Sequence, residues 1–140
     1  MAKGTRKPAK TWVYSPSKPS KPKVPDDLRI EVAQEADKLI AELKPLYIED
    51  ARKEHFLNYI VDLYTKWVGS YFYFCAKYAC PGPNALAPSF ESKFARMEYL
   101  GKNIFNLSYM RHTGKWMELE RGLTLQECMQ AIKEGPHYTP

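Results

Sequence analysis

Apolar positions recur at helical spacing near the start of the chain. From residue 26 to residue 44 they follow one another mostly three or four positions apart, with charged side chains between them. This spacing predicts one amphipathic helix that ends at Pro45, because proline lacks a backbone N–H and restricts the residue before it. Asp26 or Asp27 suits the N-cap. The predicted core positions are Leu28, Val32, Ala36, Leu39, Ile40 and Leu43.

Residues 46–56 read either as a loop or as a short helical turn. After them, side chains of different character alternate with a period of two. Residues 57–68 and 71–79 are rich in β-branched and aromatic side chains and flank Gly69-Ser70, which predicts a β-hairpin. In the first strand, strict alternation sets Ile60, Asp62, Tyr64 and Lys66 on one face and Val61, Leu63, Thr65 and Trp67 on the other.

Turn residues divide the rest of the chain into further short strands. PGPNALAP, residues 81–88, predicts a loop, and residues 101–103 and 112–115 predict turns. Between them we expect a third strand at 90–99, for which a short helix is the alternative, and a fourth at 104–111. A fifth strand begins with WMELE at residue 116.

The last helix has the clearest sequence signature. Thr124 and Glu127 have the spacing of a capping box, in which hydroxyl and carboxylate each satisfy a backbone N–H at the helix start. Leu123 and Cys128 occupy the hydrophobic-staple positions, and the Gly-Pro pair at 135–136 predicts the end. Leu125, Cys128, Met129 and Ile132 are the predicted core residues of this helix.

These elements predict an α+β fold. We expect an antiparallel meander sheet of four to five strands, with an N-terminal and a C-terminal helix packed on one face. The length of 140 residues and a hydrophobic fraction of 44% fit one domain with a true core. We find no apolar run that would span a bilayer and no secretory signal, and we expect no membrane association. Three cysteines, an odd number, indicate free thiols and a cytoplasmic location.

Charge is concentrated at the N-terminus. Residues 1–25 hold seven basic and no acidic side chains together with five of the 11 prolines, whereas the remaining residues hold 14 basic and 16 acidic side chains. We therefore predict a basic, proline-rich extended arm at 1–25 and a single domain at 26–140. Within the arm, Trp12, Val13 and Tyr14 either dock on the domain or on a partner, or stay exposed to solvent.

The segment SYFYFCAKYAC, residues 70–80, raises the question of a binding surface. On a strand, Tyr71, Tyr73, Cys75 and Lys77 share one face, while Phe72, Phe74, Ala76 and Tyr78 share the other, which is the natural core face. Exposed aromatic and basic side chains on a sheet stack bases and hold phosphates in proteins that bind single strands. The alternative is that the two tyrosines simply cover the sheet with their hydroxyls in water.

Signals for catalysis or metal binding are weaker. Cys75 and Cys80 form only one closely spaced pair, whereas a structural zinc site usually has two, so we expect buried thiols, no metal and no cofactor. The alternative is a mixed metal site of Cys75, Cys80 and one histidine. Arg111, His112 and Lys115 gather at a predicted hairpin tip and would suit an anion or an enzyme centre. P-loop and hydrolase motifs are absent from the sequence, so enzymatic activity is unsupported.

Glu118, Glu120 and Trp116 are expected on one face of the last strand, where exposure explains the two carboxylates better than acid–base chemistry does.

The arm carries the functional hypothesis that the residues favour. Lysine and arginine on an extended chain release counterions from a polyanion, which gives salt-dependent affinity. We expect a non-enzymatic protein that binds nucleic acid or a ribonucleoprotein; the alternatives are a protein–protein adaptor that uses the Trp12 segment, and an enzyme centred on Arg111, His112 and Lys115. The expected contacts are Lys3, Arg6, Lys7, Lys10, Lys18, Lys21, Lys23, Tyr71, Tyr73, Lys77, Arg111 and Lys115.

The stretch from residue 95 to the C-terminus, in which YMRHTGKW precedes a capped, leucine-rich helix, resembles a family of small conserved bacterial proteins of unknown function. NYIVDLYTKW and FYFCAKYACPGPNA resemble segments of small hypothetical proteins with Pro/Lys-rich leaders. The resemblance implies a compact α+β domain and a bacterial origin, and it implies no catalytic residue.

Overall fold

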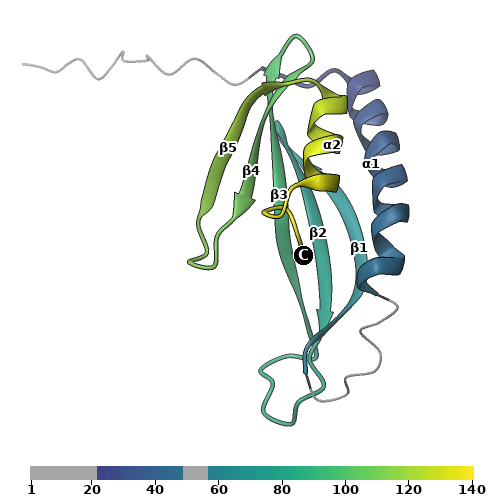
Figure 1. Cartoon of the computed structure of the whole chain (residues 1–140), viewed down its shortest axis with the longest axis vertical. Helices are drawn as coiled ribbons and strands as arrows, with labels where there is room; N and C mark the ends of the chain where they lie inside the picture. The colour runs from purple at the N-terminus through teal and green to yellow at the C-terminus, as the bar shows by residue number, and fades with distance from the viewer. Residues whose placement is uncertain (1–21, 49–56) are drawn as a thin grey trace, which may run out of the picture.

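A computed structural model describes residues 22–48 and 57–140 of the chain. Two helices flank a run of five strands in sequence order (Figure 1). The helices are α1 (Asp26–Tyr47) and α2 (Leu125–Glu134), and the strands are β1 (Tyr59–Val68), β2 (Tyr71–Ala79), β3 (Ser89–Gly101), β4 (Ile104–Met110) and β5 (Trp116–Leu123).

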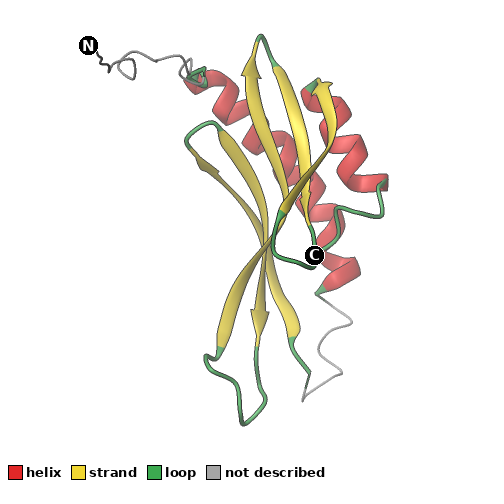
Figure 2. Cartoon of the chain, turned by 90° about the vertical axis from the view of Figure 1, so that its left-hand side faces the viewer, coloured by secondary structure: helices red, strands yellow, loops and turns green. Residues whose placement is uncertain are grey.

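The strands form one antiparallel meander in the order β1-β2-β3-β4-β5, and both helices lie on the same face of it (Figures 1 and 2). The predicted α+β class and architecture are therefore confirmed. Two-residue turns close the first and third hairpins: Gly69 takes a φ of 61° in one, and Lys102 and Asn103 take φ values of 54° and 60° in the other. Such left-handed conformations match the twist of the paired strands.

Helix α1 buries the predicted stripe, but both of its ends differ from the prediction. All six predicted core positions from Leu28 to Leu43 are buried. The N-cap is Pro25, whose carbonyl accepts from Arg29 N at 3.0 Å, while the two aspartates lie in the first turn at the positive end of the helix dipole. The helix continues past Pro45 to Tyr47, because proline removes only its own donor and Ile48 N still reaches Lys44 O at 2.8 Å.

β-Bulges change the faces of three strands. In β1 the register shifts between Ile60 and Asp62, so Ile60 lies in the core on the same side as Leu63, and the predicted strict alternation is wrong there. In β2 and β3 a shift lets both Phe94 and Ala95 point into the core. The predicted core face of β2 is confirmed, with Phe72, Phe74 and Ala76 all fully buried.

The pairing of β4 with β5 has two register shifts, one of them between Leu107 and Ser108. Ser108 pairs with Glu118 and Leu107 pairs with Glu120, so the two glutamates lie on opposite faces of the sheet. Their predicted shared face is therefore wrong, because strict alternation assumed a strand without the extra residue. Glu120 accepts a hydrogen bond from the buried Tyr138 hydroxyl at 3.0 Å, on the helix side.

Helix α2 begins as predicted. Glu127 N donates to Thr124 Oγ1 at 3.2 Å and Thr124 N donates to Glu127 Oε1 at 2.9 Å, which completes the capping box. Its four predicted core residues are buried and the C-cap is Gly135. In the described part of the chain, neither helix has the length and apolar character needed to cross a bilayer.

The end of the arm belongs to the packed structure. Val24 is 1% exposed and joins the core cluster, and Pro22 Cγ would lie 3.7 Å from a Cβ added at Gly101. The chain therefore enters the domain beside the β3–β4 turn. Residues 1–21, which hold the rest of the predicted arm, and residues 49–56 lie outside the described residues.

Candidate nucleic-acid interface

The face of the sheet opposite the two helices, here called the open face, brings together aromatic and basic side chains from separate strands. The register pairs Tyr73 with Arg96 and Met110 with Trp116, which places side chains of β2, β3 and β5 on this face. Tyr71, Tyr73 and Trp116 are each half-buried and form what we call the aromatic platform. Figure 2 views the sheet from this side.

Arg96 lies between two rings of the platform. Its guanidinium carbon is 4.6 Å from the centre of the Tyr71 ring and 4.7 Å from that of Trp116. The Nε atom of Arg96 is buried and finds no hydrogen-bond partner among the described residues, so contacts with the rings hold this end of the guanidinium. Each cation–π contact at a partly exposed site contributes about 0.5–1 kcal/mol.

Tyr73 and Trp116 meet across two intervening strands. Their ring centres are 5.8 Å apart, although three strand spacings of about 4.8 Å separate the backbones of β2 and β5. Both rings must therefore extend toward each other along the sheet. Ser108, on β4, one of the two strands between them, is only 4% exposed. The Tyr71 ring centre is 6.2 Å from that of Tyr73, and Lys93 Nζ is 5.6 Å from the Tyr73 ring.

A second cluster borders the platform on the side of β1. Glu91 accepts from Lys66 at 3.0 and 2.9 Å, from Lys93 at 3.0 Å, and from the hydroxyl of Tyr64. These donors lower the pKa of Glu91 to about 2. Burial and the neighbouring carboxylate raise the pKa of Tyr64, so it stays a neutral donor. The cluster fixes two lysine ammonium groups on the open face.

The thiols have separate environments. Cys75 is 0% exposed below this cluster, and burial raises its pKa to about 11. Cys128 is also fully buried, whereas Cys80 is half-buried, and all three are free. Within residues 22–48 and 57–140, no three His, Cys, Asp or Glu side chains gather as a metal-binding group.

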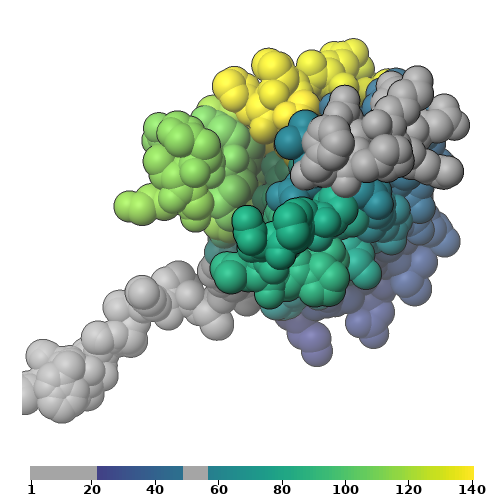
Figure 3. Space-filling model, turned by 90° about the horizontal axis from the view of Figure 1, so that it is seen from below, coloured from purple at the N-terminus to yellow at the C-terminus, as the bar shows by residue number. Residues whose placement is uncertain are grey.

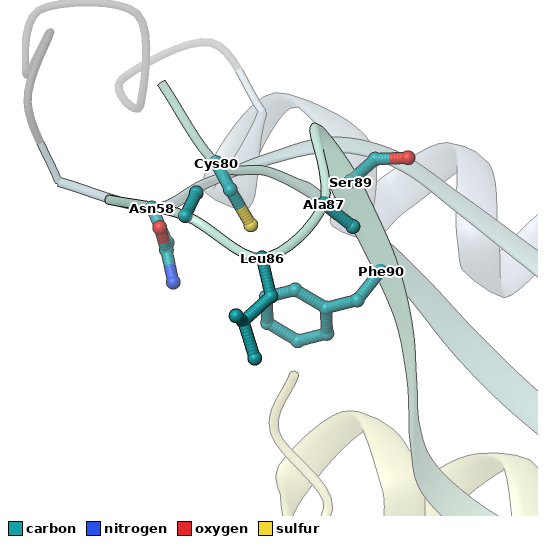
Figure 4. A pocket seen from close by; sticks show the side chains of 7 residues that line it. Asn58, Cys80, Leu86, Ala87, Ser89 and Phe90 are labelled. Atoms are coloured by element: carbon teal, nitrogen blue, oxygen red, sulfur yellow. The ribbon is translucent and has the colours of Figure 1, made fainter. Parts of the chain in front are cut away.

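Cys80 lines an apolar depression at the far end of the sheet. The depression has a volume of about 370 Å³ and lies beside the β2–β3 loop (Figure 4). Leu86 and Phe90, exposed by 106% and 44%, are the large apolar side chains among the residues that line it. The seven residues that line it carry no charged side chain, which separates this depression chemically from the open face.

The other predicted contact residues lie at several places. Lys77 is exposed and lies opposite Glu91 in the register of β2 with β3, and Lys23 is exposed at the entry of the arm. Arg111, His112 and Lys115 are exposed in the β4–β5 turn, which stands out from the body (light green in Figure 3). The remaining predicted contacts, which lie outside the described residues, are Lys3, Arg6, Lys7, Lys10, Lys18 and Lys21.

Sequence reasoning missed the residues that complete the interface, namely Lys66, Lys93, Arg96 and Trp116. For Trp116 the sequence predicts only a shared strand face with Glu118 and Glu120, because the residues of one strand do not reveal which side chains of other strands Trp116 contacts. Strict alternation would place Lys93 and Arg96, three positions apart, on opposite faces; the bulge at Phe94 adds a residue between them and brings both to the open face.

Charge is distributed unevenly among the described residues. The helices hold eight acidic and four basic side chains. The other described residues, in strands and connections, hold nine basic and five acidic ones. The described residues are therefore neutral in sum, with acidic helices and strands that hold five basic and five acidic side chains. The basic excess lies in the connections, at Lys23, Lys102, Arg111 and Lys115.

Comparison with known proteins gives a family and no function. No curated protein and no solved structure matches the chain. The family model described as "Domain of unknown function (DUF3024)" matches residues 23–139, which include Val24 at the start of the core and all seven helices and strands. The chain therefore belongs to the DUF3024 family, in agreement with the predicted relationship to proteins of unknown function.

Proposed function

We propose that this is a non-enzymatic protein that binds nucleic acid, free or in a ribonucleoprotein, through its basic arm and the open face of its sheet. The proposal places it in the bacterial cytoplasm, where its buried thiols Cys75 and Cys128 would stay reduced. The arm supplies attraction to phosphates, and the open face supplies rings and fixed cations.

One observation carries the proposal: the aromatic platform, with the cations of Arg96 and Lys93 against its rings, lies near the point where the arm enters the domain. Tyr71 pairs with Glu98, three residues before Gly101, and Gly101 is the residue that Pro22 approaches. At a strand rise of about 3.3 Å per residue, roughly 10 Å separates these positions along β3. A polyanion held by the arm would therefore pass close to the platform.

The acidic helices disfavour binding of a polyanion on their side of the domain. A phosphate backbone is repelled by the helices and attracted by the basic connections and the arm. The exposed cations Arg111 and Lys115 belong to these connections, in the β4–β5 turn. Because they are solvated on a projecting turn, they support contact with an anion better than the alternative of an enzyme centred there with His112.

The salt dependence of binding tests the proposal. The full chain is titrated with a labelled single-stranded and a labelled duplex oligonucleotide over a series of salt concentrations. A full-length variant with the six basic residues of positions 1–21 replaced by glutamine should lower the slope of log affinity against log salt, by up to about four on single strands.

A matched control replaces lysines on the opposite layer. Lys38, Lys44 and Lys133 are exposed on the two helices, and their replacement by glutamine should leave the slope unchanged. Failure of the full chain to bind either oligonucleotide, or binding that is insensitive to salt, would refute the proposed function.

A further inference from the structure

We infer that the open face selects unpaired bases, so that the preferred ligand is single-stranded RNA or DNA rather than a duplex. This inference rests on the proposed function and adds the ligand class. It assigns two roles: the arm attracts any phosphate backbone, and the platform distinguishes single strands from duplexes.

Trp116 is the central stacking residue of this site. Its indole is half-buried, extends along the sheet toward the Tyr73 ring at 5.8 Å between ring centres, and has the Arg96 guanidinium over one face at 4.7 Å. A ring held in this way, with the cation over one face, would offer its other face to an incoming base.

A duplex cannot use such a ring. Within a double helix each base is covered on both faces by its neighbours, so stacking on a protein ring requires a base that is already unpaired or is flipped out at a cost. Base–aromatic stacking tolerates any sequence, because every base has a π-face. The platform should therefore favour single strands without a strong preference for one base.

The lysines beside the platform fix where the backbone of the ligand lies. The Nζ atom of Lys93 is 5.6 Å from the centre of the Tyr73 ring. Lys93 on β3 and Lys66 on β1 both donate to Glu91, so cationic groups continue from β3 to β1. Four strand spacings from β1 to β5 span about 19 Å in all, so the face holds only a few nucleotides. Bases would lie over Tyr73 and Trp116, with phosphates toward the two lysines.

Affinity measurements on the full chain test this inference. The probes are fluorescein-labelled oligouridylate, oligothymidylate and a duplex of equal length, followed by anisotropy. Trp116→Ala should weaken binding to both single strands by roughly 5- to 150-fold and leave the duplex within about twofold. Trp116→Tyr keeps a ring and should restore most of the loss.

Phe90→Ala is the matched control, because Phe90 is an exposed aromatic at the far end of the sheet. It should change neither affinity, and thermal unfolding of each variant confirms that it is folded. Equal affinity for single strands and duplex together with an unchanged Trp116→Ala variant would overturn the inference and leave the proposed function standing. Absence of binding to all three probes would overturn both.

Discussion

The carboxylate of Glu91 offers the sharpest test of the open-face arrangement, because it accepts hydrogen bonds from three side chains, those of Tyr64, Lys66 and Lys93. Replacing it by glutamine removes the charge and keeps the shape. In the wild type, a carboxyl whose pKa falls from 4.5 to about 2 gains about 3 kcal/mol in favour of its ionised form. Its side chain is 29% exposed, and solvent screening reduces the net contribution to about 1 kcal/mol.

The pH dependence follows from the direction of this pKa change. Because the pKa is lowered on folding, the contribution is present above pH 4.5 and is lost as the pH falls toward 2. Glu91→Gln should therefore lower the free energy of unfolding by about 1 kcal/mol at neutral pH, and the difference from wild type should shrink steadily below pH 4.5.

Urea unfolding followed by circular dichroism, at neutral pH and at several lower values, measures this difference. Glu35→Gln is the control, because the Glu35 carboxylate accepts from one ammonium, that of the exposed Lys38, and from the Gln126 amide, so fewer charged donors depend on it and we expect a smaller effect. A difference for Glu91→Gln that stays constant with pH would show that the carboxylate charge is not what holds the cluster, and the reasoning would fail.

Three further predictions concern the fold. Phe72 is fully buried, and its ring centre lies 4.9 Å from that of Trp67, so Phe72→Ala should lower the free energy of unfolding in denaturant by about 3–5 kcal/mol. A decrease under about 1 kcal/mol would contradict the assigned core. Thr124→Ala should cost about 1 kcal/mol by losing the cap of α2, and Thr124→Ser should recover it; equal losses would argue against the cap. In native protein a thiol reagent should modify Cys80 quickly and the buried Cys75 and Cys128 only as the chain opens, and three thiols of equal reactivity would exclude this placement.

Much of the fold could be predicted because local physical chemistry determines it. The stripe of α1 follows from one helical period, and the start of α2 follows from a pair of side chains that satisfy each other's backbone donors. The hairpin at Gly69-Ser70 follows from the need for a left-handed residue in a two-residue turn. Each of these signals lies within a few residues of the feature it specifies.

The bulges and the cross-strand partners could not be predicted in this way. A bulge inserts one residue and reverses every later face, which is why Ile60 and Glu120 lie opposite to their predicted sides. The continuation of α1 through Pro45 depends on packing that outweighs one lost hydrogen bond. These outcomes depend on contacts between elements that are far apart in the sequence.

In the candidate site, too, local features could be predicted and contacts between strands could not. Tyr71, Tyr73 and Lys77 could be assigned to one face of a strand from alternation alone. Arg96 and Trp116 join them only through the register of β2 with β3 and of β4 with β5, which no single segment encodes. The sequence alone shows a basic, proline-rich N-terminal stretch and one aromatic strand; the fold adds that Pro22, in the described part, lies beside Gly101, three residues from the partner of Tyr71.

Mapping of contacts on the full chain tests the central claim most directly. The protein is cross-linked by ultraviolet light to a single-stranded oligonucleotide and digested with trypsin, and the cross-linked peptides are identified by mass spectrometry. We predict cross-links in residues 67–77, which contain Tyr71 and Tyr73, and in residues 116–121, which contain Trp116, together with peptides of the arm. Cross-links confined to α1 and α2, or spread without preference over the surface, would contradict a binding site on the open face of the sheet.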